Sequence, residues 1–445
     1  MKRVRVSQFI TQSAANGKLP PGSMGFPFVG ETIEFILNRE AIRVPPFVQK
    51  RLARYGPIFR TNLFGQKMVV IADSEIAYRL FHQEEEHYKI TTPGALFKYM
   101  KNLVLPLIGS ENLKRTLLRE INESTTRRHV QSWASHDVVD VTEATSTMIL
   151  EYIAKRVISY DESKDARNLK ENYNAFVRGI VSIPLNIPGT GYHACLQARD
   201  NIRKAIKDIF EERKASKMKH GDFLYCLLEE MRKEDNIMSE ALARDIIFGI
   251  LFGTYETSRL AMTMLVKFLS QHPEVVAELK KEHEAIIESR GFEKSEITWD
   301  EYKSMTFTHM VINETIRLGN ILPGIFRKVV KDVQIKGYTI PAGWMVMINT
   351  TVLHLDPDKY DDPLTFNPWR WGGKEMTKSS KTFMGFGLNP RLCLGADLAK
   401  LQMAIFLHYL VLNYRWEFAK GGDIIRRPWL EFPNGLHIKI SKYLE

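Results

Sequence analysis

Cys393 is the residue whose type and position point to the most distinctive chemistry. It lies in the loop FGLNPRLCLG, residues 386–395, directly before an apolar pattern with helical spacing. A sulfur at a helix N-terminus is favoured as the thiolate, because free N–H groups and the positive end of the helix dipole face it. A thiolate binds iron, and Arg391 adds a guanidinium that can grip a carboxylate. The loop therefore predicts a metal ligand at Cys393, with a buried structural cysteine as the alternative.

The loop resembles the haem-binding loop of the cytochrome P450 family, the haem-thiolate monooxygenases, whose pattern is F-x-x-G-x-R-x-C-x-G. Four of the five fixed positions match, namely Phe386, Arg391, Cys393 and Gly395. Asn389 stands at the fifth, and asparagine tolerates the left-handed backbone of glycine better than other side chains do. The resemblance implies haem b as the cofactor, with Cys393 as its iron ligand and the other three matching residues as contacts.

Glu314 and Arg317 have the i,i+3 spacing of an ion pair on one helix face. A pair of this kind is usually solvated, but apolar residues flank this one on both sides. Further along the chain, FNPWRW over residues 366–371 resembles a family segment whose arginine completes a buried triad. The resemblance assigns Glu314, Arg317 and Arg370 to a structural network beneath the haem loop rather than to chemistry on substrate.

A continuous helical pattern runs from Ser239 to about Gln271 and contains GTYETS at residues 253–258. An acid and a hydroxyl beside a glycine are unfavourable in the middle of a helix. One interpretation is a helix kink in which the Thr257 hydroxyl bonds back to the backbone. The other is a resemblance to the family motif Ala/Gly-Gly-x-Asp/Glu-Thr, with Thr254 in place of its second glycine. That resemblance implies that Thr257 hydrogen-bonds the reacting oxygen and that Glu256 helps to relay protons from solvent.

Three cations could meet the two haem propionates that the resemblance implies. Arg391 lies in the loop, and Arg327 follows the helix that carries Glu314. Lys101 stands where the family's Trp/His-x-x-x-Arg helix has its arginine. Lysine is a point charge rather than a fork, so a solvated lysine is an equal alternative at that position.

The elements that must position these residues are mainly helical. Helical patterns dominate between about Glu120 and Leu318, whereas strands are expected near the ends of the chain. Ile58–Leu63 and Met68–Ile71 predict one hairpin, and residues 430–440 predict another around a Pro-Asn-Gly turn. The resemblance implies the cytochrome P450 fold, a mainly α triangular prism with a small β region. In that fold haem is buried between a long central helix and the helix after Cys393.

No linker, repeat or low-complexity stretch divides the 445 residues, so we expect one haem-binding domain over residues 31–445. Three cysteines argue against a disulfide framework and for a reducing compartment, and Cys226 is expected in the core. The net charge of +10 is spread along the chain without a dense basic tract, so nucleic acid is not an expected partner.

The N-terminal region has two expected parts. Residues 1–17 are basic and lack the roughly 18 apolar residues needed to span a bilayer. Residues 18–30 resemble the proline-rich hinge that follows the membrane anchor in plant and animal family members. The resemblance implies the cytosolic face of the endoplasmic reticulum membrane, and the basic start with Phe26, Phe28 and Val29 suits a peripheral attachment. A truncated form and a soluble form are the alternatives.

The resemblance covers nearly the whole chain and is closest to the plant branch that oxidises triterpenoids, sterols and related isoprenoids. It implies an NADPH-dependent monooxygenase that hydroxylates a C–H bond of a large apolar isoprenoid. Electrons would come from NADPH through an NADPH–cytochrome reductase. A basic face around Lys378, Lys381, Arg391 and Lys400 is the expected docking surface for it.

Two rival functions stay open. The chain is shorter between Gln83 and Phe97 than that branch usually is, and the missing piece normally forms the first wall of the substrate pocket. Together with Asn389, this makes a haem-binding but catalytically degenerate family member the main rival. A haem-thiolate isomerase or dehydratase is less favoured, because such enzymes often lack the Glu256–Thr257 pair.

Overall fold

The computed structural model divides the chain into two compact units, each assembled from separated segments. Unit 1 contains Met1–Lys101, Asn313–Ala396 and Ile424–Glu431, and unit 2 contains Asn102–Ile312, Asp397–Asp423 and Phe432–Glu445. The structure describes residues 17–27, 29–37, 41–82, 88–89, 94–122, 127–180, 182, 184–216, 220–234, 237–290, 296–322, 324–374, 380–388, 391–427 and 429–443. The single haem-binding domain over residues 31–445 stays a prediction.

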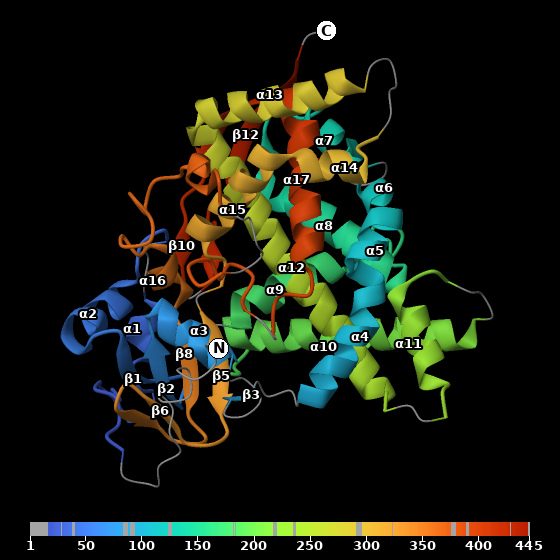
Figure 1. The fold of residues 1–445 in the computed structure, drawn as a ribbon. Helices are drawn as coiled ribbons and strands as arrows, with labels where there is room; N and C mark the ends of the chain where they lie inside the picture. Colours follow the sequence, from blue (N-terminus) through green and yellow to red (C-terminus); the bar gives the residue numbers. More distant parts are fainter. Residues whose placement is uncertain are drawn as a thin grey trace, which may run out of the picture. The chain divides into compact units, whose positions relative to one another are not determined.

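Unit 1 contains a five-stranded sheet with the order β1-β2-β8-β5-β3 (Figure 1). Its strands are β1 (Ile58–Leu63), β2 (Gln66–Ile71), β3 (Tyr88–Lys89), β5 (Ile325–Val329) and β8 (Met345–Ile348). The antiparallel β1–β2 pair confirms the first hairpin expected from the sequence. Phe64 and Gly65 make its turn at φ values of 54° and 73°, the left-handed backbone that tight hairpin turns require.

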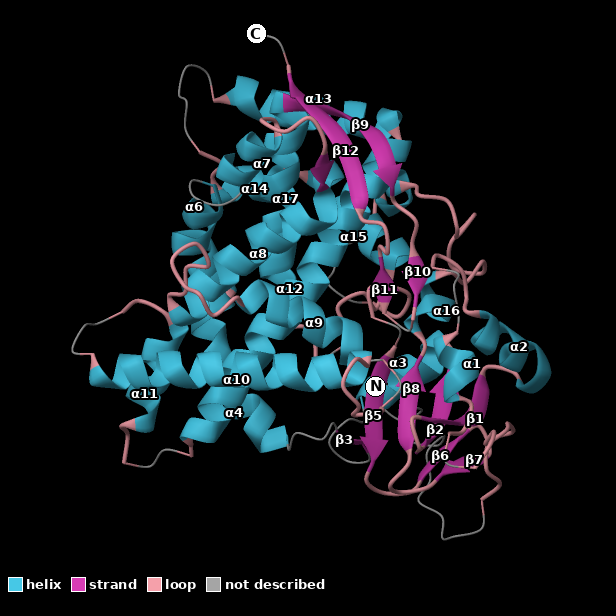
Figure 2. Ribbon diagram, turned by 180° about the vertical axis from the view of Figure 1, so that it is seen from behind, coloured by secondary structure: helices cyan, strands magenta, loops and turns pink. Residues whose placement is uncertain are grey.

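Both faces of β2 are buried, which explains its continuous apolar run. Met68 and Val70 pack with the apolar face of α2, whereas Val69 and Ile71 pack with that of α3. Figure 2 shows α1 and α2 beside the β1 edge of this sheet. The remaining elements of unit 1 are α1 (Thr32–Ile36), α2 (Pro46–Tyr55), α3 (Ser74–His82), β6 (Val333–Ile335), β7 (Tyr338–Ile340), α16 (Thr350–His354), the 3-10 turn Pro368–Trp371, β10 (Ile425–Arg426) and β11 (Leu430–Glu431).

Unit 2 is helical around α12 (Glu240–Gln271), which confirms the long helix expected over residues 239–271. Ser239 begins it as a cap, because its hydroxyl accepts a hydrogen bond from the Leu242 N–H at 3.1 Å. At about 1.5 Å per residue, its 32 residues span roughly 48 Å. α8 lies alongside α12, and α9 alongside α10 (Figure 2).

The helices contributed wholly or partly by unit 2 are α4 (Gly94–Ile108), α5 (Ser110–Asn112), the π-turn Leu113–Leu117, α6 (Leu118–Glu120), α7 (Arg127–Trp133), α8 (Val141–Ile158), α9 (Leu169–Ile180), α10 (Gly191–Ala215), α11 (Phe223–Met231), α12, α13 (Pro273–Ser289), α14 (Trp299–Ser304), α15 (Thr306–Gly319) and α17 (Ala396–Asn413). Its sheet has the order β4-β12-β9, with β4 (Val139–Asp140), β9 (Tyr414–Gly421) and β12 (Leu436–Lys442). The protein is thus mainly α with a small β region, as the sequence predicts.

Two sequence expectations about local structure are wrong. The hairpin expected over residues 430–440 does not form, because β11 pairs with β10 whereas β12 pairs with β4 and β9. Cys226 is exposed rather than in the core, because α11 buries Phe223, Leu224, Leu227 and Leu228 and turns Cys226 to the opposite face. Within the described ranges, no helix has both the length and the apolar character needed to cross a bilayer.

Candidate active site

The Cys393 loop folds back on itself ahead of α17. The Cys393 N–H donates to the Phe386 carbonyl at 2.9 Å, and the Gly387 N–H donates to the Met384 carbonyl at 2.9 Å. Gly387 has a φ of 81°, a conformation that favours glycine. Cys393 is exposed, unlike the buried Cys195, and α17 begins three residues later. The loop therefore presents a thiol that a ligand can reach at the start of a helix.

The structure describes Gly395 of this loop but not Asn389. Asn389, the departure from the family pattern, lies outside the described residues. Gly395 faces open space, since a Cβ placed on it would meet no atom within 4 Å. A flat prosthetic group can thus approach the backbone closely on that side of Cys393.

The three predicted propionate contacts all belong to unit 1, as Cys393 does. The Arg391 guanidinium lies 3.9 Å from the centroid of the Phe97 ring on α4. Lys101 lies one turn further along α4 and is half-buried. Arg327 is buried on β5, where its guanidinium lies 4.8 Å from the centroid of the Phe81 ring. A reachable sulfur together with three cationic side chains fits an iron porphyrin, which carries one metal ion and two carboxylates.

Glu314, Arg317 and Arg370 are brought together in a buried network. The Glu314 carboxylate accepts hydrogen bonds from Arg317 Nε and Nη2 at 2.8 and 2.7 Å and from Arg370 Nε at 2.9 Å. The Asn367 N–H and the Trp371 indole N–H each donate a further bond, both at 3.0 Å. Five donors therefore surround a carboxylate whose residue is 0% exposed.

His354 joins this network to the segment that precedes the haem loop. Its backbone carbonyl accepts from Arg317 Nη1 at 2.8 Å, and its ring Nε2 accepts from the Met384 N–H at 3.0 Å. Burial, aided by the charge of Arg317, lowers the pKa of His354 to about 3, so the ring is neutral and Nε2 can accept. Sequence reasoning missed His354, and no spacing in the chain marks it.

Glu256 and Thr257 lie on α12, within unit 2. The Thr257 hydroxyl donates to the Gly253 carbonyl at 2.6 Å, which is the back-bonded arrangement that the kink interpretation expects. Its oxygen still has lone pairs with which to accept a hydrogen bond. Gly253 faces open space, since an added Cβ would meet no atom within 4 Å. The open space beside Gly253 therefore lies on the same face of α12 as the Thr257 hydroxyl.

Glu256 is buried and carries a partner that sequence reasoning missed. Arg259 donates Nε to one carboxylate oxygen and Nη2 to the other, both at 2.7 Å. Burial raises the pKa of the Glu256 carboxyl above its ordinary value, and the Arg259 charge opposes that rise. The signal for this pair was present, because Glu-Thr-Ser-Arg has the same i,i+3 spacing as the pair at Glu314.

The basic docking face expected around four residues is only partly present. Lys381 is exposed and pairs with Glu75 at 2.9 Å. Lys400 is 6% exposed and adds little charge to any surface. Lys378 lies outside the described residues.

The chain is similar to known proteins over nearly all its length. A family model described as Cytochrome P450 matches residues 100–442. Cytochrome P450 87A3 of Oryza sativa subsp. japonica is 46% identical over 445 residues, which cover 96% of this chain and 86% of that protein. Cucurbitadienol 11-hydroxylase of Siraitia grosvenorii is 38% identical, covering 96% of this chain and 94% of that protein.

A sterol-oxidising relative and a solved structure extend the same pattern. Cholesterol 22-monohydroxylase CYP90B52 of Paris polyphylla is 36% identical, covering 97% of this chain and 95% of that protein. The retinoic-acid-bound cyanobacterial CYP120A1 matches with a TM-score of 0.83 at 24% identity, covering 96% of this chain and 100% of that one. At that identity the solved structure shows likeness of fold alone.

Proposed function

This chain belongs to the cytochrome P450 family of haem-binding monooxygenases, and we propose that it hydroxylates a C–H bond of a large apolar isoprenoid, a triterpenoid or a sterol. The observation that supports this substrate class most strongly is the coverage of two relatives. Hydroxylases named for cucurbitadienol and for cholesterol each align with at least 96% of the chain. The overall reaction consumes dioxygen, NADPH and a proton, and it yields the alcohol, water and NADP⁺.

Residues of unit 1 are proposed to hold the haem b. Cys393 would provide the thiolate ligand, and Phe386 and Gly395 would contact the ring. Arg391 and Arg327 would form ion pairs and hydrogen bonds with the propionates, and Lys101 would contribute a weaker ion pair. When bound, the haem supplies the redox chemistry that activates dioxygen. The observation that supports this assignment is the exposed thiol in a loop closed by its own backbone hydrogen bonds.

Residues of unit 2 are proposed to manage protons. Thr257 would accept or donate a hydrogen bond at the reacting oxygen from the open face of α12. Glu256 would pass protons from solvent, since a carboxyl whose pKa burial raises can carry a proton nearer to neutral pH. The open space at Gly253 supports the approach of a small molecule to this turn.

The Glu314 network is proposed to act through structure. Arg317 and Arg370 fix the loop segments that contain Pro363 and Asp361, whose carbonyls accept from Arg317 Nη1 at 2.8 Å and from Arg370 Nη1 at 2.7 Å. His354, which is bonded to Arg317, also fixes the backbone of Met384 by accepting a hydrogen bond from its N–H. The network would therefore hold the haem loop in shape without touching substrate.

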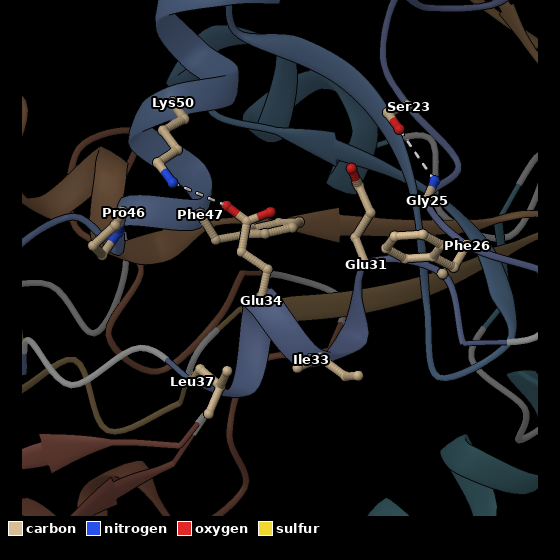
Figure 3. A pocket seen from close by; sticks show the side chains of 11 residues that line it. Ser23, Gly25, Phe26, Glu31, Ile33, Glu34, Leu37, Pro46, Phe47 and Lys50 are labelled. Carbon is tan, nitrogen blue, oxygen red and sulfur yellow. Dashed lines mark hydrogen bonds and ion pairs between the residues drawn. The ribbon is translucent and has the colours of Figure 1, made fainter.

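An apolar patch on unit 1 supports a peripheral contact with the cytosolic face of the endoplasmic reticulum membrane. Phe26, Ile33 and Leu37 are 79%, 60% and 67% exposed, and all three line one open groove of about 940 Å³ around α1 (Figure 3). Lys50, which forms an ion pair with Glu34 at 3.4 Å, lies at the rim of that groove. Exposed apolar side chains beside a lysine suit the interface of a bilayer. Phe28, expected in the same contact, lies outside the described residues.

Electrons are proposed to arrive from NADPH through an NADPH–cytochrome reductase. The test reconstitutes the protein with a plant reductase, NADPH and a panel of triterpenoids and sterols, and it detects products by mass spectrometry. We expect a product that is heavier than its substrate by one oxygen atom and absent with Cys393→Ser. A protein with a thiolate-type haem spectrum but no product from any panel member would instead be the catalytically degenerate family member.

A further inference from the structure

Arg259 holds both oxygens of the Glu256 carboxylate from one turn away on α12. The two contacts are equally short at 2.7 Å, and the two side chains are only 14% and 10% exposed. A bidentate contact fixes the plane of the carboxylate as well as its position. Among the described residues, every hydrogen bond to the Glu256 carboxylate comes from Arg259.

Arg259 is itself held in place by its surroundings in unit 2. Its guanidinium lies 5.8 Å from the centroid of the Tyr255 ring, and its backbone carbonyl accepts from the Thr263 hydroxyl at 2.8 Å. Tyr255 is 0% exposed and donates its hydroxyl proton to Asn174 on α9 at 2.7 Å. The Arg259 guanidinium therefore lies near the Tyr255 ring, whose position is fixed by α12 and by Asn174 on α9.

We propose that Arg259 is a positioning residue for proton delivery: it sets where the Glu256 carboxylate lies and the pH at which that carboxylate takes up a proton. The inference rests on the proposed function of Glu256 in the oxygen chemistry. Each carboxylate oxygen accepts one hydrogen bond from Arg259 and keeps a second lone pair on which a proton can bind. Protonation removes the negative charge that the guanidinium stabilises, so Arg259 opposes the uptake of a proton by Glu256.

Two opposing effects act on Glu256, and Arg259 supplies one of them. Burial raises the pKa of the carboxyl, whereas the charge and the hydrogen bonds of Arg259 lower it. Removal of the guanidinium leaves burial unopposed, so the carboxyl should bind its proton at higher pH. A lysine would keep the charge but lose the fork, so it separates the electrostatic effect from the orienting one.

The test is an infrared titration of the holoprotein at rest, which follows the protonated-carboxyl stretching band. Glu256→Gln identifies the band, because it is the signal that this variant lacks. In Arg259→Leu we expect the midpoint of that band to move to higher pH by at least about one pH unit. In Arg259→Lys the midpoint should stay near that of the wild type. Arg244→Leu is the matched control, since Arg244 pairs with Glu240 at 3.5 Å on the same helix.

An unchanged midpoint in Arg259→Leu, or an equal shift in Arg244→Leu, would overturn the inference. Turnover gives a second readout, in which Arg259→Leu should shift the pH profile of hydrogen peroxide released per product, and Arg259→Lys should restore it. The two failures are distinguishable. If no product forms from any substrate, the proposed function fails while the infrared midpoint still reports on Arg259. If product forms and the midpoint does not move, only the inference about Arg259 fails.

Discussion

Two Glu-x-x-Arg pairs in this protein have the same spacing but differ in how many hydrogen-bond donors surround the carboxylate. Glu314 and Arg317 in unit 1 are both 0% exposed, and Glu314 accepts five hydrogen bonds from four residues. The side chains of Glu256 and Arg259 in unit 2 are 10% and 14% exposed, and among the described residues the Glu256 carboxylate accepts two hydrogen bonds, both from Arg259. The first pair is locked by its surroundings, whereas the second depends on a single partner.

The difference shows that spacing specifies a pair but not its role. Five donors hold the Glu314 carboxylate in one position, and all five would lose their acceptor if it were removed. A buried carboxylate with one partner is balanced between burial and that partner, so its charge can change. The difference supports the proposed division of roles, in which Glu314 is structural and Glu256 takes part in proton delivery.

The largest expected effect comes from removal of the locked carboxylate. Glu314→Ala leaves Arg317 and Arg370 buried without their counter-charge, which should lower the free energy of unfolding by about 3–5 kcal/mol. Chemical denaturation and the yield of soluble holoprotein measure it, with Glu240→Ala on α12, a half-buried carboxylate, as the control. A variant with normal haem content and melting temperature would break the distinction between the two pairs.

Substitution by lysine should lower the free energy of unfolding more at Arg317 than at Arg259. Arg317→Lys loses the planar fork that serves Glu314 and the carbonyls of His354 and Pro363, so we expect a cost of about 2–4 kcal/mol. Arg259→Lys keeps the positive charge beside a carboxylate that has fewer partners, and it should cost about 1 kcal/mol. Urea unfolding of both variants measures the difference. Equal costs would mean that the surroundings of the two pairs do not matter.

Two buried histidines, His283 and His408, are kept neutral by their surroundings, unlike the charged residues of the two Glu-x-x-Arg pairs. His283 and His408 share a hydrogen bond between their Nδ1 atoms at 3.1 Å, and burial lowers the pKa of each to about 3. The unfolded chain binds these protons below about pH 6.5 and the folded chain does not. Stability should therefore fall as pH drops from about 6.5 toward 3, by up to about 1.4 kcal/mol per pH unit for each imidazole.

His408→Asn tests this slope, since an amide keeps a hydrogen-bond donor but does not titrate. The variant should show a shallower dependence of unfolding free energy on pH over that window. His136→Asn, at an exposed imidazole, is the control for the substitution itself. A His408→Asn slope as steep as that of the wild type would show that this pair does not stay neutral in the fold.

A similarly small effect on stability is expected at Thr257. Thr257→Ala removes one hydroxyl that bonds back to Gly253, which should cost about 1 kcal/mol. The haem spectrum should be intact, but more hydrogen peroxide should be released per product, because proton delivery is no longer directed. The ratio of NADPH consumed to product formed measures this. A ratio equal to that of the wild type would reduce Thr257 to a helix residue.

The sequence was sufficient wherever local chemistry decides the outcome. The helical pattern from Ser239, the turn at Gly65 and the apolar pattern after Cys393 are local signals, and the structure has the helix α12, the β1–β2 hairpin and the helix α17 that they indicate. Strand pairing near residues 430–440 was mispredicted, because the partners of β11 and β12 are chosen by distant packing rather than by the turn between them.

Partners across long separations were out of reach of sequence reasoning. His354 belongs to the Glu314 network through a backbone carbonyl and a ring nitrogen, and neither leaves a trace in residue spacing. Arg259 was within reach, because its i,i+3 spacing to Glu256 is visible, but a surface pair and a buried pair have the same pattern. Burial, which the local sequence does not fix, decides between them.

The most direct test of the account is the spectrum of the reduced protein with carbon monoxide. Thiolate ligation by Cys393 predicts the red-shifted Soret band that is peculiar to sulfur-ligated haem. Cys393→Ser should lose that band, and Cys226→Ser, which changes an exposed thiol on α11, should keep it. A wild-type spectrum like that of a histidine-ligated globin would contradict the account.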